Sequence, residues 1–478
     1  MKTLIQSSLK VIGIALIGIL AFAACEEKEE KNDDLAYDDV LVEAACNCES
    51  DWFPHTQTPA PEEGKGSPFD TTSTTNCMFQ QWAWQKFLWL TKPQADGNPL
   101  FLDSLTQVTS NMDTITEQPG ATIVLTDIHQ AGFDAVLASN PSFNASHNVS
   151  DTVYYSIHVN PTLQNAAAQF RNELNNGTLP IKNTETFPIG SLEVKMAWVA
   201  TTSIPSADVS NYFTTTAAFQ ESDGSYNNVE VALLGVHVVG VVINHPEFIW
   251  ATFAHSDMAP VFDWNSETAS SSSQTLLFAT ATTSSLNGIK YSGGKPVTAD
   301  QAFELFEYGV PRSKGNDFIK TSQSEPENFN NIDNLNNCVA SNLTDVWTNY
   351  FYDGAIWINT DGLTPTQQAD TLVALAGNLH DVTPGSIVRG STNNANLTME
   401  TFIQTLQSDP NKIDASNLFN CFNCHSAKKG SSNDTISPLY LSHIFEGYWL
   451  LGEGKTPEEI NELKLSRFLE RMEASNKE

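Results

Sequence analysis

Basic residues are scarce in this sequence. It holds 24 Lys and Arg against 56 Asp and Glu among 478 residues, which gives a formal net charge of −32. A nucleic acid backbone is bound through clustered Lys and Arg, and an acidic surface repels it. The composition therefore excludes a nucleic acid partner. Apolar residues make up 40% of the chain, enough for a sizeable core, so wholesale disorder is also excluded.

Long apolar segments are missing as well. The N-terminal run from Val11 to Ala24 has 14 residues, too few to cross a bilayer as a stable helix. It follows Lys2 and Lys10, a pattern typical of a signal peptide, which we assign to residues 1–24. The small residues before Cys25 resemble the lipobox of bacterial lipoproteins, and this resemblance implies that Cys25 is acylated. Ordinary cleavage beside an unmodified cysteine is the alternative.

Residues 25–50 are predicted to form an acidic tether. Eight acids and two lysines lie between Glu26 and Asp39, and such a segment stays solvated because it cannot pack. Acids directly after a lipidated cysteine also resemble the surface-export signal of Bacteroidota-type lipoproteins. The resemblance implies an outer membrane lipoprotein of the cell envelope, held by its lipid anchor. It is compatible with the outward-facing leaflet, and the sequence leaves the face of the membrane open.

A CxxCH motif stands near the C-terminus, formed by Cys421, Cys424 and His425. Two thiols at this spacing can bond to the two vinyl groups of one haem, and the next residue is then placed to coordinate iron. The βαβ pattern that surrounds a thioredoxin-type CxxC is absent here, which disfavours a redox disulfide. We therefore predict one covalent haem c with His425 as the proximal ligand.

The sixth iron position decides whether such a haem transfers electrons or binds a substrate. His443, in the apolar stretch 438–445, is the predicted sixth ligand. Met399 is the alternative on the other side of the motif. For both residues, simple core packing is the competing interpretation.

Four further cysteines remain, and they are Cys46, Cys48, Cys77 and Cys338. An even number in an exported chain predicts disulfides. Cys46 and Cys48 are too close in an extended chain to bridge each other comfortably, so each is expected to pair with one of the other two. The sequence leaves the pairing open. A CxC metal site is the less favoured alternative.

The segment 51–395 is predicted to be an α+β domain of unknown activity, and its first clear element is helical. From Met78 to Leu90 the residues are aromatic-rich and apolar on nearly all sides, without the alternation of a strand. This pattern predicts a buried helix that ends at residues 91–93.

The centre of this domain is predicted to be β-rich. Three runs rich in β-branched residues indicate strands; they are 190–200, 229–243 and 248–253. Tight connections are expected at 223–224 and 245–246. The turn-forming composition of 265–285 and 322–337 predicts surface loops. No repeat of fixed period is visible.

Residues 396–478 are predicted to be a small, mainly helical haem c segment, since a cytochrome domain needs a length of this order. Thr456 to Glu459 forms a capping box with Pro457 at the first helical position, which predicts a closing amphipathic helix. The predicted fold class is therefore α+β, with a mixed N-terminal body, a β-rich centre and this C-terminal segment.

Five blocks ahead of the CxxCH motif carry a family resemblance; they are 82–90, 193–198, 235–239, 246–255 and 397–402. In content and order they resemble an uncharacterised family of exported bacterial cytochrome c proteins over most of the mature chain. The resemblance implies a single C-terminal haem c joined to a large domain of unknown activity.

Two histidines inside these blocks, His237 and His255, are candidate catalytic or haem-pocket residues. His255 would be a proton donor, with Lys195 or Glu193 as its electrostatic partner. Ordinary histidines satisfied by the backbone are the competing interpretation.

Three functions fit these observations. The first is a membrane-anchored mono-haem cytochrome that exchanges electrons with a redox protein or a small-molecule donor or acceptor. The second is a haem c-dependent redox enzyme, such as a peroxidase or oxygenase, whose N-terminal domain holds the substrate. The third is a surface binding protein with a structural haem. The large body favours the last two, whereas His443 favours the first, which is our prediction.

Overall fold

The computed structural model describes residues 46–71, 77–126, 136–138, 140, 150–221, 223–258, 277, 290–292, 295–297, 325–375, 388–390, 396, 398–399, 421–428 and 436–464. The chain divides into two compact units, Met1–Ala44 and Ala45–Glu478. All described residues belong to the second unit. The predicted signal peptide, Cys25 and the acidic residues 26–39 lie outside the described residues.

A nine-stranded, mainly antiparallel sheet forms the centre of the second unit. Its main order is β1-β5-β6-β8-β9-β12-β13, while β7 pairs with β8 and β2 pairs with β7 in parallel. The strands are β1 Thr106–Val108, β2 Ile123–Leu125, β5 Tyr154–Val159, β6 Leu192–Ala200, β7 Thr214–Gln220, β8 Tyr226–Val242, β9 His245–His255, β12 Tyr350–Ile358 and β13 Val388–Gly390. Two small hairpins stand apart, β3 Val136–Ala138 with β4 Ser150–Thr152 and β10 Lys290–Ser292 with β11 Lys295–Val297.

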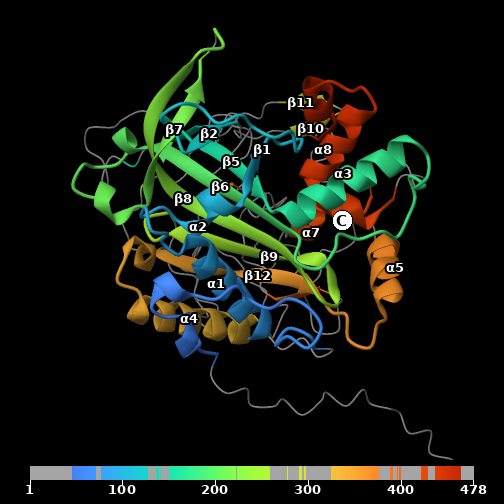
Figure 1. Ribbon diagram of the computed structural model, residues 1–478, viewed down its shortest axis with the longest axis horizontal. Helices are drawn as coiled ribbons and strands as arrows, with labels where there is room; N and C mark the ends of the chain where they lie inside the picture. Colours follow the sequence, from blue (N-terminus) through green and yellow to red (C-terminus); the bar gives the residue numbers. More distant parts are fainter. Residues whose placement is uncertain are drawn as a thin grey trace, which may run out of the picture. The chain divides into compact units, whose positions relative to one another are not determined.

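Helices cover both faces of the sheet (Figure 1). The α-helices are α1 Met78–Thr91, α2 Leu100–Ser104, α3 Pro161–Asn175, α4 Glu325–Asn342, α5 Pro365–Leu375, α7 Cys421–Cys424 and α8 His443–Gly452. The 3-10 helices are η1 Ser50–Trp52, η2 His55–Gln57, η3 Thr201–Ser203, η4 Val209–Asn211, η6 Val346–Asn349 and η8 Pro438–Leu441. We call the side covered by α1 and α4 the α1 face, and the side covered by α3 and α8 the α8 face. Helix and antiparallel sheet together make the fold α+β, as predicted.

Each face of the sheet has its own apolar core. On the α1 face, α1 and α4 pack on alternate residues of the central strands, such as Val194, Val238 and Phe253. On the α8 face, α3, η8 and α8 pack on the intervening residues, including Val239 and Trp250. Described residues on both sides of position 396 therefore share one core, and residues 421–428 and 436–464 pack as a layer on the sheet.

The predicted helix and strands are present as α1, β6, β8 and β9. The predicted connections were only partly right. Residues 223–224 join β8 to β7, a Thr-rich strand that the β-branched runs did not reveal. The tight turn before β9 lies at 243–244 instead of 245–246, because Asn244 adopts the left-handed backbone (φ 65°) that closes it.

The predicted surface loop 322–337 was wrong over most of its length, since α4 occupies it from Glu325. Its Asn-rich composition hides a helical repeat of Ile332, Leu335 and Val339, all buried against the sheet. Tertiary packing of this apolar side outweighs the weak helix propensity of asparagine. The other predicted loop, 265–285, lies outside the described residues except for one position.

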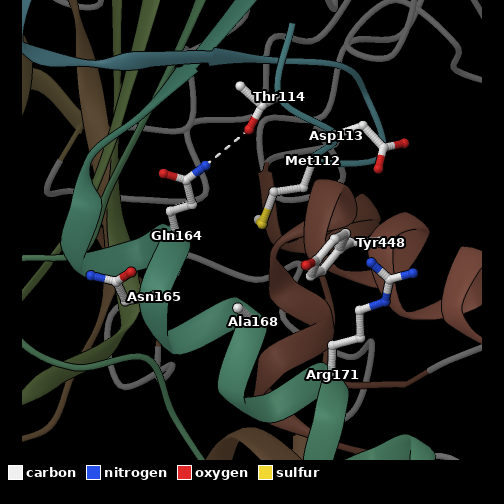
Figure 2. A pocket seen from close by; sticks show the side chains of 8 residues that line it. All are labelled: Met112, Asp113, Thr114, Gln164, Asn165, Ala168, Arg171 and Tyr448. Atoms are coloured by element: carbon white, nitrogen blue, oxygen red, sulfur yellow. Dashed lines mark hydrogen bonds between the residues drawn. The ribbon is translucent and has the colours of Figure 1, made fainter.

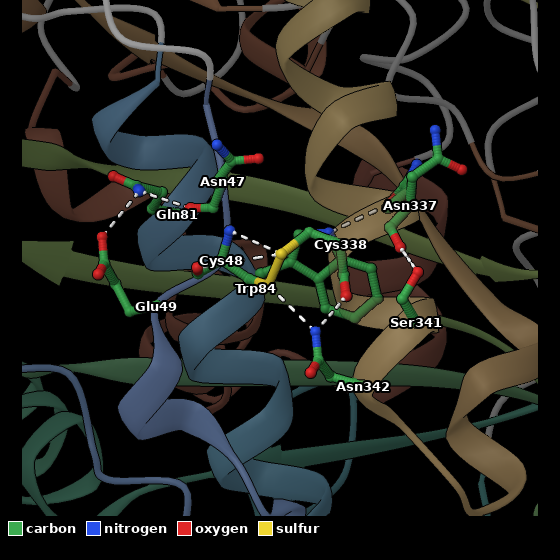
Figure 3. The surroundings of a disulfide bond; sticks show 10 residues. Asn47, Cys48, Glu49, Gln81, Trp84, Asn337, Cys338, Ser341 and Asn342 are labelled. Carbon is green, nitrogen blue, oxygen red and sulfur yellow. Dashed lines mark hydrogen bonds between the residues drawn. A yellow bond between two sulfur atoms is a disulfide. The ribbon is translucent and has the colours of Figure 1, made fainter.

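Two disulfides join the start of the described body to α1 and α4. Cys46 bonds to Cys77, with 5.5 Å between Cα atoms, and Cys48 bonds to Cys338, with 5.8 Å. Figure 3 shows the second bond between the N-terminal segment and α4, with Trp84 of α1 beside it. The pairing left open by the sequence is thus settled in the structure. Residues 46–50, assigned to the tether, belong to the folded body, and Cys46 is buried.

A buried histidine makes stability depend on pH. Burial lowers the pKa of His158, on β5, to about 3, so between pH 3 and 6.5 the unfolded chain binds a proton that the folded chain excludes. Stability should therefore fall as pH falls from 7 to 5, by about 2 kcal/mol for this group. Urea unfolding of the mature protein at both values checks this. His158→Gln should show a smaller difference, and an equal difference would contradict the prediction.

Candidate functional site

The CxxCH motif forms a helical turn that presents His425. Cys421 to Cys424 make α7, and the His425 N–H continues the turn by donating to the Cys421 carbonyl at 2.8 Å. The His425 Nδ1 lies 2.7 Å from the Leu441 carbonyl oxygen. A carbonyl only accepts, so the proton is on Nδ1 and, in the neutral ring, Nε2 carries the lone pair. Metal-binding histidines are commonly held in this way.

The wall behind His425 is apolar and aromatic. Its ring lies 4.1 Å from that of Trp250, on β9, between ring centroids. Phe422 and Leu439 are fully buried in the same core. Cys421 is half-buried, and the side chain of Cys424 lies outside the described residues. The donor set, the tautomer of His425 and the apolar wall all fit a covalently attached haem.

The structure brings His443, the first residue of α8, to His425. The two rings stack, with centroids 3.9 Å apart and an angle of 22° between their planes. Two axial ligands of one iron lie on opposite faces of the porphyrin. Rings in stacking contact leave no room for a macrocycle between them, so this arrangement does not place His443 opposite His425 across one porphyrin.

A carboxyl on β6 fixes the turn between Leu441 and His443. The Ser442 hydroxyl donates to Oε2 of Glu193 at 3.2 Å and accepts the Phe445 N–H as the N-cap of α8. Loss of solvent raises the pKa of Glu193, and the hydrogen bond from Ser442 offsets part of that rise. The sequence pattern predicted Glu193 only as an electrostatic partner of His255, because the contact with Ser442 joins residues far apart in the chain.

Strand register places Lys195, His237 and Thr252 side by side. Lys195 of β6 pairs with His237 of β8, which pairs with Thr252 of β9. These three residues, which we call the polar row, share the α8 face with Trp250. The His237 Nδ1 lies 2.9 Å from the Thr252 hydroxyl, and the Lys195 ammonium lies 5.2 Å from the centre of the Tyr155 ring.

The short segment around Met399 lies on the same face, farther along the strands. The Asn396 side chain donates to the Phe253 carbonyl at 3.1 Å and covers Gly235 so closely that a Cβ there would overlap it. The Tyr155 hydroxyl donates to the Thr398 carbonyl. Met399 is fully buried. Met399 therefore belongs to a short segment on the α8 face.

His255 lies on the opposite, α1 face, apart from Lys195 and Glu193. Its Nε2–H donates to the Asn211 carbonyl at 3.0 Å, and its Nδ1 accepts the Asp257 N–H at 3.1 Å. Burial lowers its pKa, which keeps the ring neutral. The expected partnership of His255 with Lys195 or Glu193 was wrong, because side chains alternate between the two faces along β9.

A shallow depression lies between the loop after β1, α3 and α8. Figure 2 shows the Arg171 guanidinium and the Tyr448 ring on its wall, and the Gln164 amide donates to the Thr114 hydroxyl at 3.2 Å. The guanidinium carbon is 3.9 Å from the ring centre. None of the sequence-predicted site residues lines it.

Comparisons with known proteins identify no relative of this chain. No protein-family model matches the chain, and no curated protein or solved structure does. Within the part of the chain that the structure describes, no helix has both the length and the apolar character to span a membrane. Among those same residues, no three His, Cys, Asp or Glu side chains gather closely enough to hold a metal ion.

Proposed function

We propose that this protein is a mono-haem c-type cytochrome that transfers electrons in the cell envelope, anchored to the outer membrane through Cys25. The observation that supports it best is the bond between His425 Nδ1 and the Leu441 carbonyl. It leaves the lone pair on Nε2 of the residue that follows the CxxC turn, as iron ligation requires. Cys421 and Cys424 would hold the haem, which when bound supplies one-electron redox chemistry.

The protein's own residues would tune that chemistry. Trp250 and the apolar core around Phe422 exclude water from one side of the site, and exclusion of solvent favours rapid electron exchange with little reorganisation. The hydrogen bond to Leu441 increases the basicity of His425 and fixes its ring. The partner would be a redox protein or a small-molecule electron donor or acceptor.

The test is an optical titration of mature protein made in cells that attach haem. We expect a six-coordinate, low-spin spectrum that changes reversibly with the applied potential. A colourless protein would contradict the proposed function.

The sixth ligand can be assigned with two variants. Because His443 stacks on His425, we propose Met399 as the ligand on the other side of the haem. Met399→Ala should convert the low-spin spectrum into a high-spin one, whereas His443→Ala should keep it low-spin. Conversion by His443→Ala alone would restore His443 as the sixth ligand.

The stacking of His443 on His425 also favours a second function, that of a haem c-dependent redox enzyme. If Met399 does not ligate the iron, the position opposite His425 stays open for peroxide or oxygen. A wild-type protein that is already high-spin, and that binds carbon monoxide rapidly when reduced, would identify this function instead.

A further inference from the structure

The polar row of Lys195, His237 and Thr252 is unusual for the middle of a covered sheet face. Lys195 and His237 are half-buried. Their neighbours toward α8, Val239 and Trp250, are nearly fully buried. Polar side chains between apolar residues cost free energy that packing alone does not repay. A few polar groups in apolar surroundings are characteristic of binding sites.

The two parts of the candidate haem site lie on either side of this row. One step along the strands is the row of Glu193, Val239 and Trp250, over which His425 and Ser442 lie. One step in the other direction is the row of Ala197, Gly235 and Ala254.

The second of these flanking rows is made of small residues, and the Asn396 side chain covers it at Gly235. Each step corresponds to two residues, about 7 Å. Along the strands, the polar row therefore lies between the CxxCH turn and the segment that contains Met399.

The charges around the row favour an anion. The ammonium of Lys195 and, from the C-terminal helix, that of Lys464 act on Glu193, and so does His237. Glu193 therefore lies near two ammonium groups, and solvent exclusion raises its pKa.

We propose that the polar row binds carboxylate groups, and that these are the two propionates of the haem held by Cys421, Cys424 and His425. The inference rests on the proposed function. Lys195 supplies a charge-assisted donor to a carboxylate oxygen. His237 and Thr252 share one hydrogen bond with each other, so with a neutral imidazole ring this pair has one N–H or O–H left to donate to a carboxylate. The row would orient the haem edge toward the sheet and would set its reduction potential.

The experiment compares haem content and reduction potential in haem-loaded protein. Lys195→Met should retain the covalent haem, measured by intact mass. It should also favour the ferric form about tenfold at a given potential, a fall of about 59 mV for a one-electron couple. The physical reason is that a nearby positive charge opposes the extra charge of ferric iron. Lys195→Arg should stay close to wild type.

A matched control is Lys65→Met, which removes the same charge from an exposed position and should leave the potential unchanged. An unchanged potential in haem-loaded Lys195→Met would overturn the inference and leave the cytochrome proposal standing. If wild-type protein takes up no haem, the cytochrome proposal itself fails.

Should Lys195→Met not fold, Thr252→Val tests the same row, because it removes one hydroxyl at nearly constant volume. Its potential should also fall, and an unchanged value counts against the row. A free small carboxylate is the alternative ligand of the polar row. Succinate that shifts the potential of wild type, but not of Lys195→Met, would assign the row to a free ligand instead of the propionates.

Discussion

Alanine at both Cys421 and Cys424 should give a mature protein without colour, lighter than wild type by one haem, about 600 Da, in addition to the two cysteine sulfur atoms. Both thioether bonds are lost in this variant, and a single imidazole at His425 holds haem weakly. Mass spectrometry and the absorption spectrum of purified protein measure the effect. If the two proteins had equal masses apart from the two sulfur atoms, covalent attachment would be contradicted.

The matched control removes two cysteines outside the motif. Cys46→Ala with Cys77→Ala deletes a disulfide on the α1 face and leaves α7 untouched. This variant should retain its haem spectrum if it folds. Loss of colour in both double variants would indicate that folding, and not the CxxCH motif, had failed.

The second large effect concerns the disulfide between Cys48 and Cys338. It joins residues 290 positions apart, so it restricts the unfolded chain strongly and also ties the N-terminal segment to α4. Replacing both cysteines by alanine should lower the free energy of unfolding by about 2–5 kcal/mol. The urea midpoint of the mature protein measures this.

The haem spectrum of the same variant is its internal control, since the bond lies on the α1 face and the CxxCH turn lies on the α8 face. We expect a lower midpoint with an unchanged spectrum below it. A midpoint equal to that of oxidised wild type would show that this bond does not stabilise the fold.

Local patterns predicted those parts of the fold that depend on neighbours in the chain. The aromatic-rich run became α1 because its side chains are apolar on nearly all sides, and the β-branched runs became β6, β8 and β9. The capping box is present, with Thr456 and Glu459 exchanging hydrogen bonds at 2.9 and 3.2 Å. The Asn-rich α4 was missed because its helical pattern becomes clear only against the sheet that buries it.

The sequence by itself determined the candidate chemistry, because CxxCH is a covalent spacing that requires no knowledge of the fold. It also indicated that four cysteines form disulfides. Only the tertiary structure decided which cysteines pair, that His443 stacks on His425, and that His255 lies on the other face. The register of β6, β8 and β9 likewise created the polar row. These relations are non-local, since strand pairing and layer packing bring together residues whose separation in the chain carries no signal.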